Sequence, residues 1–474
     1  MVTISRHNRK SASTWVLALT AVASLMVALD VTVVTTALPT IKANLRASTE
    51  QLEWTVNAYA LSFAVLLMTA AALGDRFGRR RLFTFGLALF VVASAACAVA
   101  PGIAGLIAAR AVQGAGAALV APLALALLSA AFPPERRAWA LGIFSAVTGL
   151  AVLGGPVIGG AITQVIAWNW IFWLNVPIGL LTIVLALRRI EESFGPNSAL
   201  DIRGLVLAAG AALGLVWGLV RGNPAGWGSV EVVGSLALGV LLMAGFVVWE
   251  LRAREPMLPM HLFGSRGFSA GNAAVFCLFA SLFAAVYFMA QFLQIALHDG
   301  PLDAGLRLLP WTATLFFVAP IAGRRIGHVG ERPFIITGLF LQAVGMAWIA
   351  LIAAPDLAYG QLVAPFIIAG AGVSMALPAA QSVVVSSVAP CHIGKASGAF
   401  TTMRQLGGAF GVAILVAVFA GAGSYHSPHA FSDGFTSAIA VAAGLSLAGA
   451  ISALAIPGRR GAVVTAPVHA EAAQ

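Results

Sequence analysis

The sequence has little charge. Only 9% of its 474 residues are Asp, Glu, Lys or Arg, whereas a soluble domain carries about 25%. This excludes a soluble enzyme and a disordered chain, because both expose many charged side chains to water. The chain also has only three cysteines, and their positions follow neither a disulfide nor a metal-binding spacing. A secreted disulfide scaffold is therefore excluded, and we expect no metal site.

Apolar residues take the place of charge. They make up 60% of the chain, and the mean hydropathy is +0.94. This is enough for some fourteen apolar segments of about 20 residues each. We therefore predict an all-α polytopic membrane protein, because a helix pairs all its interior backbone polar groups within itself in a bilayer.

Apolar runs predict fourteen membrane-spanning helices. The first six lie near residues 14–38, 52–73, 82–100, 103–130, 138–164 and 170–187. Two more lie near 200–220 and 230–250. The last six lie near 268–296, 305–326, 334–353, 361–387, 397–420 and 434–456.

Basic residues indicate the orientation. About 22 of the 27 Lys and Arg residues fall in the two tails and in the loops of one side, which the positive-inside rule assigns to the cytoplasm. We therefore expect both termini to be cytoplasmic in the inner membrane of a bacterium. This clustering also accounts for the net charge of +10 without a nucleic-acid partner.

The two ends of the chain resemble each other. The run from Gly114 to Pro122 recurs from Gly370 to Pro378, although chance similarity between Gly- and Ala-rich helices is the alternative. Further matches at the same offset pair Gly142, Phe144 and Gly155 with Gly398, Phe400 and Gly411. Two such halves, related by an axis along the membrane normal, are typical of transporters whose bundles rock.

The predicted organisation follows from this repeat. It consists of a tail over residues 1–13, a six-helix bundle over 14–190, two inserted helices over 191–260, a second six-helix bundle over 261–456 and a disordered tail over 457–474. The copies differ in where charge survives, since Arg110 corresponds to Phe366 and Asp75 to Gly327. Ionisable groups inside a membrane mark function by default, so we place the chemistry in the first bundle.

Four motifs carry a resemblance to a known family. They are Leu29–Pro39, Gly74-Asp-Arg-Phe-Gly-Arg-Arg-Arg81, Leu106–Ala118 and Gly155-Pro-Val-Ile-Gly-Gly160. Together they resemble the fourteen-helix drug:proton antiporters of the major facilitator superfamily. The chain departs from that pattern at Asn169, where the branch has Arg. The resemblance implies multidrug or antibiotic efflux driven by the proton gradient, with no cofactor.

Asp30 and Arg110 are the predicted proton-coupling residues. Asp30 lies in the middle of an apolar helix, where a carboxyl is costly to keep charged, so we expect it to bind and release a proton. The alternative is a structural side chain bonded to Thr32 or to a neighbouring helix. Arg110 keeps its charge, and therefore needs Asp30, backbone carbonyls or Gln113 as a partner.

Two short motifs are predicted to control conformation. The loop between the second and third helices contributes Asp75, Arg76, Gly78, Arg79 and Arg80. Salt bridges in such a loop can hold one conformation and break in another, while simple anchoring by positive charge is the alternative. The fifth helix contributes Gly155, Pro156, Gly159 and Gly160, which allow bending and close packing, or serve packing alone.

Residues that could line a central substrate site are polar or aromatic and lie within the predicted helices. The candidates are Asn57, Tyr59, Gln113, Tyr287, Phe288, Gln291, Gln294, Arg404 and Gln405. Tyr287, Gln291 and Gln294 recur at spacings of four and three, so they share a helix face.

The sequence therefore predicts a monomeric antiporter that exports a small, largely hydrophobic compound in exchange for protons. The alternative is a proton-coupled uptake symporter for a small metabolite. A membrane-embedded enzyme is disfavoured, because it would need clustered His, Asp or Glu, and the eight His residues are scattered.

Overall fold

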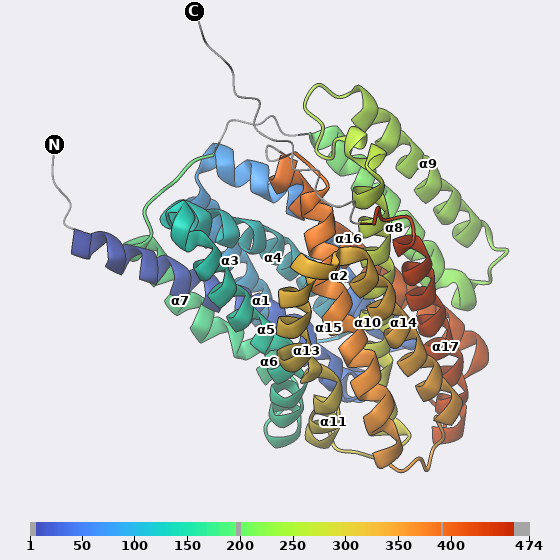
Figure 1. Cartoon of the computed structure of the whole chain (residues 1–474). Helices are drawn as coiled ribbons and strands as arrows, with labels where there is room; N and C mark the ends of the chain where they lie inside the picture. The colour runs from blue at the N-terminus through green and yellow to red at the C-terminus, as the bar shows by residue number, and fades with distance from the viewer. Residues whose placement is uncertain (1–5, 196–200, 390–391, 459–474) are drawn as a thin grey trace, which may run out of the picture.

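The computed structural model describes residues 6–195, 201–389 and 392–458, and within these ranges it contains helices and no strand (Figure 1). The predicted tails lie partly outside the described residues, which exclude 1–5 and 459–474. Helix α1 begins at Arg6, so the described part of the N-terminal tail continues the first helix.

The helices follow the predicted order. The N-terminal half contains α1 (Arg6–Leu45), α2 (Thr49–Phe77), α3 (Arg79–Ala98), α4 (Ile103–Ala131), α5 (Pro134–Val165), α6 (Trp170–Trp173) and α7 (Asn175–Arg189). The inserted pair is α8 (Ile202–Ala225) and α9 (Val230–Arg252). The C-terminal half contains η1 (Met260–Gly264), α10 (Arg266–Ile295), α11 (Pro301–Arg307), α12 (Leu309–Thr312), α13 (Thr314–Val329), α14 (Glu331–Ile352), α15 (Gly360–Ser386), α16 (Ile393–Ala422) and α17 (Pro428–Ala453).

Twelve helical segments of the described residues are long and apolar enough to cross a membrane, and the bent helix α2 makes a thirteenth. Helix α5, with 32 residues, matches the remaining predicted span. The count of fourteen crossings stays a prediction.

Two predicted spans are not continuous helices. The sixth divides into α6 and α7 at Leu174, and the tenth divides into α11, α12 and α13. Pro177 follows the interruption at Leu174, and Pro310 lies between the interruptions at Leu308 and Ala313. Proline lacks a backbone N–H and its ring clashes with the preceding turn, so it interrupts a helix that hydropathy alone continues.

The two halves use the same contact between glycines. A Cβ on Gly86 of α3 would lie 3.1 Å from the carbonyl oxygen of Gly116 in α4. In the second half, a Cβ on Gly338 of α14 would lie 2.5 Å from the carbonyl oxygen of Gly372 in α15. Small residues let membrane helices pack this closely. The matching positions agree with the internal repeat.

The inserted helices lie beside the two halves. Helix α8 packs on α2 and α16, and α9 packs on α8 at the outside of the bundle (Figure 1). Helix α8 therefore touches both halves, whereas α9 presents most of its side chains to the surroundings.

The two halves meet at the end that carries the α1–α2 and α10–α11 connections, here called the α1–α2 end. Gln294 of α10 donates to the Thr36 carbonyl of α1 at 3.0 Å, and the Leu302 N–H donates to Gln164 of α5 at 2.9 Å. Apolar side chains of both halves form one cluster at this end. The structure is therefore closed at the α1–α2 end.

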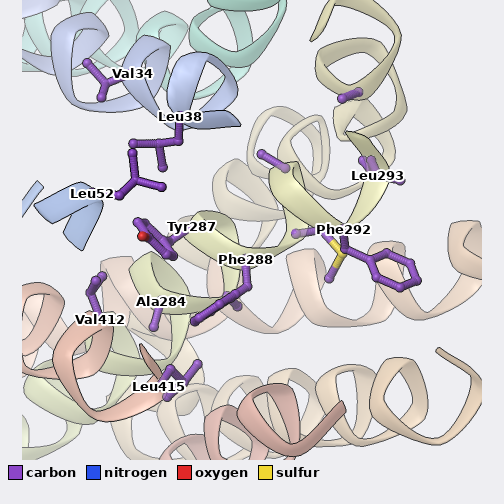
Figure 2. Close-up of a cluster of buried hydrophobic side chains, with 14 of the residues drawn as sticks. Val34, Leu38, Leu52, Ala284, Tyr287, Phe288, Phe292, Leu293, Val412 and Leu415 are labelled. Carbon is purple, nitrogen blue, oxygen red and sulfur yellow. The ribbon is translucent and has the colours of Figure 1, made fainter. Parts of the chain in front are cut away.

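Figure 2 shows part of this cluster. Leu38 of α1 and Leu52 of α2 lie beside Tyr287 of α10, with Val412 and Leu415 of α16 on the other side. The cluster joins elements far apart in the sequence, so separation of the halves at this end would expose apolar surface.

Candidate functional site

Asp30 lies at the centre of a buried polar network between α1, α3, α4 and α7. Its Oδ2 forms an ion pair with Arg110, and the side chains of both residues are almost fully buried. Its Oδ1 accepts hydrogen bonds from Gln113 at 2.8 Å and from Asn175 at 3.0 Å. Every one of these partners donates to the carboxyl, an arrangement that serves the ionised carboxylate.

Arg110 uses all three kinds of partner predicted from the sequence. Besides Asp30, it donates to Gln113 at 2.7 Å and to the carbonyl oxygen of Thr55 in α2 at 3.1 Å. Its guanidinium carbon also lies 4.3 Å from the ring centre of Tyr59. Through Arg110, the carboxyl of α1 is connected to the backbone of α2.

Ser94 and Asn175 belong to this network and were missed from the sequence. The Ser94 hydroxyl accepts from Gln113 at 3.0 Å and from Asn175 at 2.9 Å. Asn175 begins α7, within the predicted sixth span. A polar Asn within an apolar span is the signal that could have found it.

Asn169, which departs from the family pattern, has a structural contact. Its side-chain amide donates to the carbonyl oxygen of Ala98 at 2.8 Å. This bond satisfies one of the carbonyls at the end of α3, which have no partner within that helix.

The turn between α2 and α3 is fastened to the segment that follows α7. Asp75 forms an ion pair with Arg79 at 2.7 Å. The carbonyl oxygen of Asp75 accepts from the Gly195 N–H at 3.1 Å, and the Arg79 N–H donates to the Ser193 carbonyl at 2.9 Å. The gating residues predicted in this loop therefore contact the chain that leads to the inserted helices.

Gly78 joins α2 to α3 with a φ of +108°, a conformation that favours glycine. Arg76 lies over the ring of Phe77, 5.4 Å from its centre. Glu192 was not predicted, yet its carboxylate accepts from the Arg80 N–H at 2.8 Å at the start of α3. A carboxylate at a helix N-terminus accepts from backbone donors that lack helical partners, and its negative charge interacts favourably with the helix dipole.

We expect Glu192→Ala to destabilise this turn. The change leaves the N–H groups of Arg80 and Arg81 without their acceptor, and loss of such an acceptor at a helix N-terminus costs about 0.5 to 2 kcal/mol. Thermal unfolding of the purified protein in detergent measures the effect. Glu191→Ala, a change at the exposed neighbouring residue, is the control. Equal unfolding temperatures for the two variants would contradict the role of Glu192 as the acceptor at the start of α3.

The glycines of α5 form the contact with α1 and α11. A Cβ on Gly155 would lie 2.5 Å from Thr32 Cβ, and one on Gly159 would lie 2.5 Å from the Val33 carbonyl oxygen. A Cβ on Gly160 would lie 2.7 Å from the Pro301 carbonyl carbon of the other half. This motif therefore packs α5 into the closed α1–α2 end, and its neighbour Pro156 is buried there.

We expect Gly159→Ala to loosen this contact. The added methyl must displace the backbone of α1, and such overpacking costs about 1 to 3 kcal/mol. Gly149→Ala in the same helix is the control, because nothing lies within 4 Å of a Cβ there. Thermal unfolding compares the two, and a Gly159→Ala variant as stable as Gly149→Ala would rule out the close contact.

The substrate-binding candidates of the N-terminal half divide between two polar clusters. Tyr59 and Gln113 contact Arg110 in the network described above. Asn57 instead donates to Glu53 at 3.2 Å. Glu53 lies one helical turn nearer than Asn57 to the α1–α2 end.

The C-terminal half brings its candidates to two further places. Helix α10 supplies Tyr287, Phe288, Gln291 and Gln294. Gln291 accepts from the Tyr425 hydroxyl at 2.7 Å, whereas Gln294 bonds to α1. Helix α16 supplies Arg404 and the buried Gln405. The guanidinium of Arg404 lies over the ring of Phe279, and its Nε has no hydrogen-bond partner. The candidates thus form two groups. One lies around Arg110 and includes Tyr59, which is near Arg404, and the other lies around Glu53 and includes Asn57 and Tyr287.

Comparisons with known proteins agree with a membrane transporter. A sequence model described as Major Facilitator Superfamily matches residues 20–412 and 271–468. The chain is 36% identical to the tetracenomycin C resistance and export protein of Streptomyces glaucescens over 83% of this chain and 74% of that protein. It is also 36% identical to the cephamycin export protein CmcT of Amycolatopsis lactamdurans, over 89% of this chain and 88% of that protein.

Two other comparisons extend this result. The chain is 33% identical to the puromycin resistance protein pur8 of Streptomyces alboniger, over 93% of this chain and 90% of that protein. Among solved structures, a peptide transporter POT in complex with sulfate superposes with a TM-score of 0.68 at 17% identity, over 93% of this chain and 94% of that one. This second likeness concerns the fold alone.

Proposed function

Because the chain belongs to the Major Facilitator Superfamily, we propose that it exports small, largely hydrophobic drugs or antibiotics in exchange for protons. Relatives named for resistance or export at 33% to 36% identity support export. Support for proton exchange comes from one observation above all, the buried Asp30–Arg110 ion pair. A membrane protein keeps such a pair in its interior at a cost.

The proposed orientation follows from the distribution of basic residues. The α2–α3 turn carries Arg76 and Arg79 to Arg81, and the positive-inside rule favours a cytoplasmic position for such a basic end. The α1–α2 end then faces outward, and the structure corresponds to a state closed to the outside. We further propose a monomer in a bacterial inner membrane with both termini cytoplasmic.

Proton exchange would occur at Asp30. In the state described here the carboxylate is held by Arg110 and two amide donors. Protonation removes the negative charge, weakens the ion pair and releases Arg110 from α1. Proton and substrate then favour different conformations of the same two halves, and each binding event shifts the population between them. The protein exchanges protons for drug if the proton and the drug cannot be bound at the same time.

Measurement of drug accumulation tests this proposal. Cells that express the protein should retain less tetracenomycin C, cephamycin or puromycin than cells with an empty vector, for at least one of these compounds. Collapse of the proton gradient should raise retention to the level of the control cells. Gradient-dependent retention above that level would instead identify an uptake symporter.

A further inference from the structure

Glu53 is a second carboxyl buried within a membrane-spanning helix. It lies in the second turn of α2, with none of its surface exposed. Its Oε1 accepts a bond from Asn57 at 3.2 Å, and its Oε2 has no partner. None of the ion pairs formed by the described residues includes Glu53. Asp30, in contrast, has a cation and two amide donors. The environment of Asp30 therefore stabilises a carboxylate, whereas that of Glu53 does not.

The charged groups near Glu53 in the N-terminal half and in α8 have other contacts. Glu50, on the preceding turn of α2, binds Arg221 of α8 at 3.2 Å. Lys42 of α1 lies 3.5 Å from the Thr49 hydroxyl. Glu53 thus has a like charge nearby and no cation paired with it, and both conditions disfavour its ionised form.

The C-terminal half offers hydroxyl groups in place of cations. The phenols of Tyr287 and Tyr425 lie near Glu53. Tyr425 donates to Gln291, while the hydroxyl of the buried Tyr287 has no hydrogen-bond partner. The Lys42 ammonium lies over the Tyr425 ring, 2.9 Å from its centre. These groups belong to the surface on which the two halves meet.

A cavity of about 250 Å³ connects Glu53 with the partly exposed start of α2. Thr49 and Glu50 line it together with Glu53, Asn223 lines it from α8, and apolar side chains line it from α16. Its lining is mainly apolar, and the Glu53 carboxyl is buried behind it in the closed state. The inserted helix α8 therefore forms one wall of the cavity that lies beside Glu53 at the α1–α2 end.

We propose that Glu53 is a second proton-binding site, protonated while the outer end is closed and ionised once it opens. The inference rests on the orientation and alternating access proposed above. Burial without a cation requires the neutral acid in the closed state, whereas water admitted between the halves solvates the carboxylate. Protonation therefore stabilises closure, and the closed population rises as the external pH falls.

Infrared difference spectroscopy of the purified protein tests protonation directly. The carbonyl stretch of a protonated carboxylic acid should be present at pH 7 and lost in Glu53→Gln, while Glu50→Gln retains it. Glu53→Asp, which keeps an acid, should retain a band at a shifted frequency. An unchanged band in Glu53→Gln, or the absence of any band in the wild type at pH 7, would overturn the proposal.

A distance measurement tests the link to conformation. Spin labels at Asn44 and His426, both exposed at the outer end, report its opening after replacement of the native cysteines. Raising the pH from 6 to 9 should increase the long-distance population, and Glu53→Gln should lose this response while Glu50→Gln keeps it. A full response in Glu53→Gln would overturn the proposal. Both measurements are repeated in the Asp30→Asn background. If coupling at Asp30 fails, the carbonyl band of Glu53 should still be present, so the two proposals can fail independently.

Discussion

Asp30→Asn should abolish drug resistance and reduce efflux to the level of cells without the transporter. Asparagine has nearly the same shape and can still accept hydrogen bonds from Gln113 and Asn175, but it cannot take up or release a proton. It also removes the negative charge that pairs with Arg110. Minimum inhibitory concentrations and dye efflux in whole cells measure the loss, which we expect to be complete.

A matched control separates coupling from folding. Asp433→Asn makes the same chemical change on the exposed face of α17, and it should leave resistance unchanged. Membrane expression and a monodisperse elution profile establish that the Asp30→Asn protein is folded. Wild-type resistance in folded Asp30→Asn would remove Asp30 from the mechanism.

Arg110→Ala should have the largest effect on stability. The change leaves the Asp30 carboxylate buried without its cation, and breaking a buried ion pair costs about 3 to 5 kcal/mol. Arg110→Lys keeps the charge, but a single ammonium cannot reproduce the bonds that the guanidinium makes to Asp30, Gln113 and the Thr55 carbonyl. We expect coupled transport to be lost in Arg110→Ala and reduced in Arg110→Lys.

The double variant Asp30→Asn with Arg110→Ala tests the reason for this loss. Removal of both charges leaves no unpaired carboxylate, so the double variant should unfold at a higher temperature than Arg110→Ala alone, yet transport no drug. Thermal unfolding in detergent compares the three proteins. Additive losses in the double variant, or wild-type coupling in both Arg110→Ala and Arg110→Lys, would contradict the proposed role of the pair.

The sequence predicted the centre of the polar network because charge is scarce in this chain. An intramembrane Arg110 must find an acid or polar partner, and Asp30 and Gln113 were among the few available. Ser94 and Asn175 could not be predicted in the same way, since their membership depends on how α3 and α7 are rotated toward α4. Neither spacing nor hydropathy carries that information.

The substrate candidates illustrate the same limit at a larger scale. Spacing predicted that Tyr287, Gln291 and Gln294 share a face of one helix, but the opposing helices decide their neighbours. Gln291 bonds to Tyr425, and Gln294 bonds to α1. Hydropathy also could not predict where the helices are interrupted, because apolar residues continue through Pro177 and Pro310. The fold class and the internal repeat, in contrast, follow from composition and glycine spacing that persist over the whole chain.

Substrate-driven proton movement in proteoliposomes tests the central claim most directly. A pH-sensitive dye inside the vesicles reports protons while an exported drug is added under an imposed pH gradient. The wild type should dissipate the gradient only when the drug is present, and Asp30→Asn should show no drug-dependent proton flux. Drug-dependent flux in Asp30→Asn equal to that of the wild type would contradict proton exchange at Asp30.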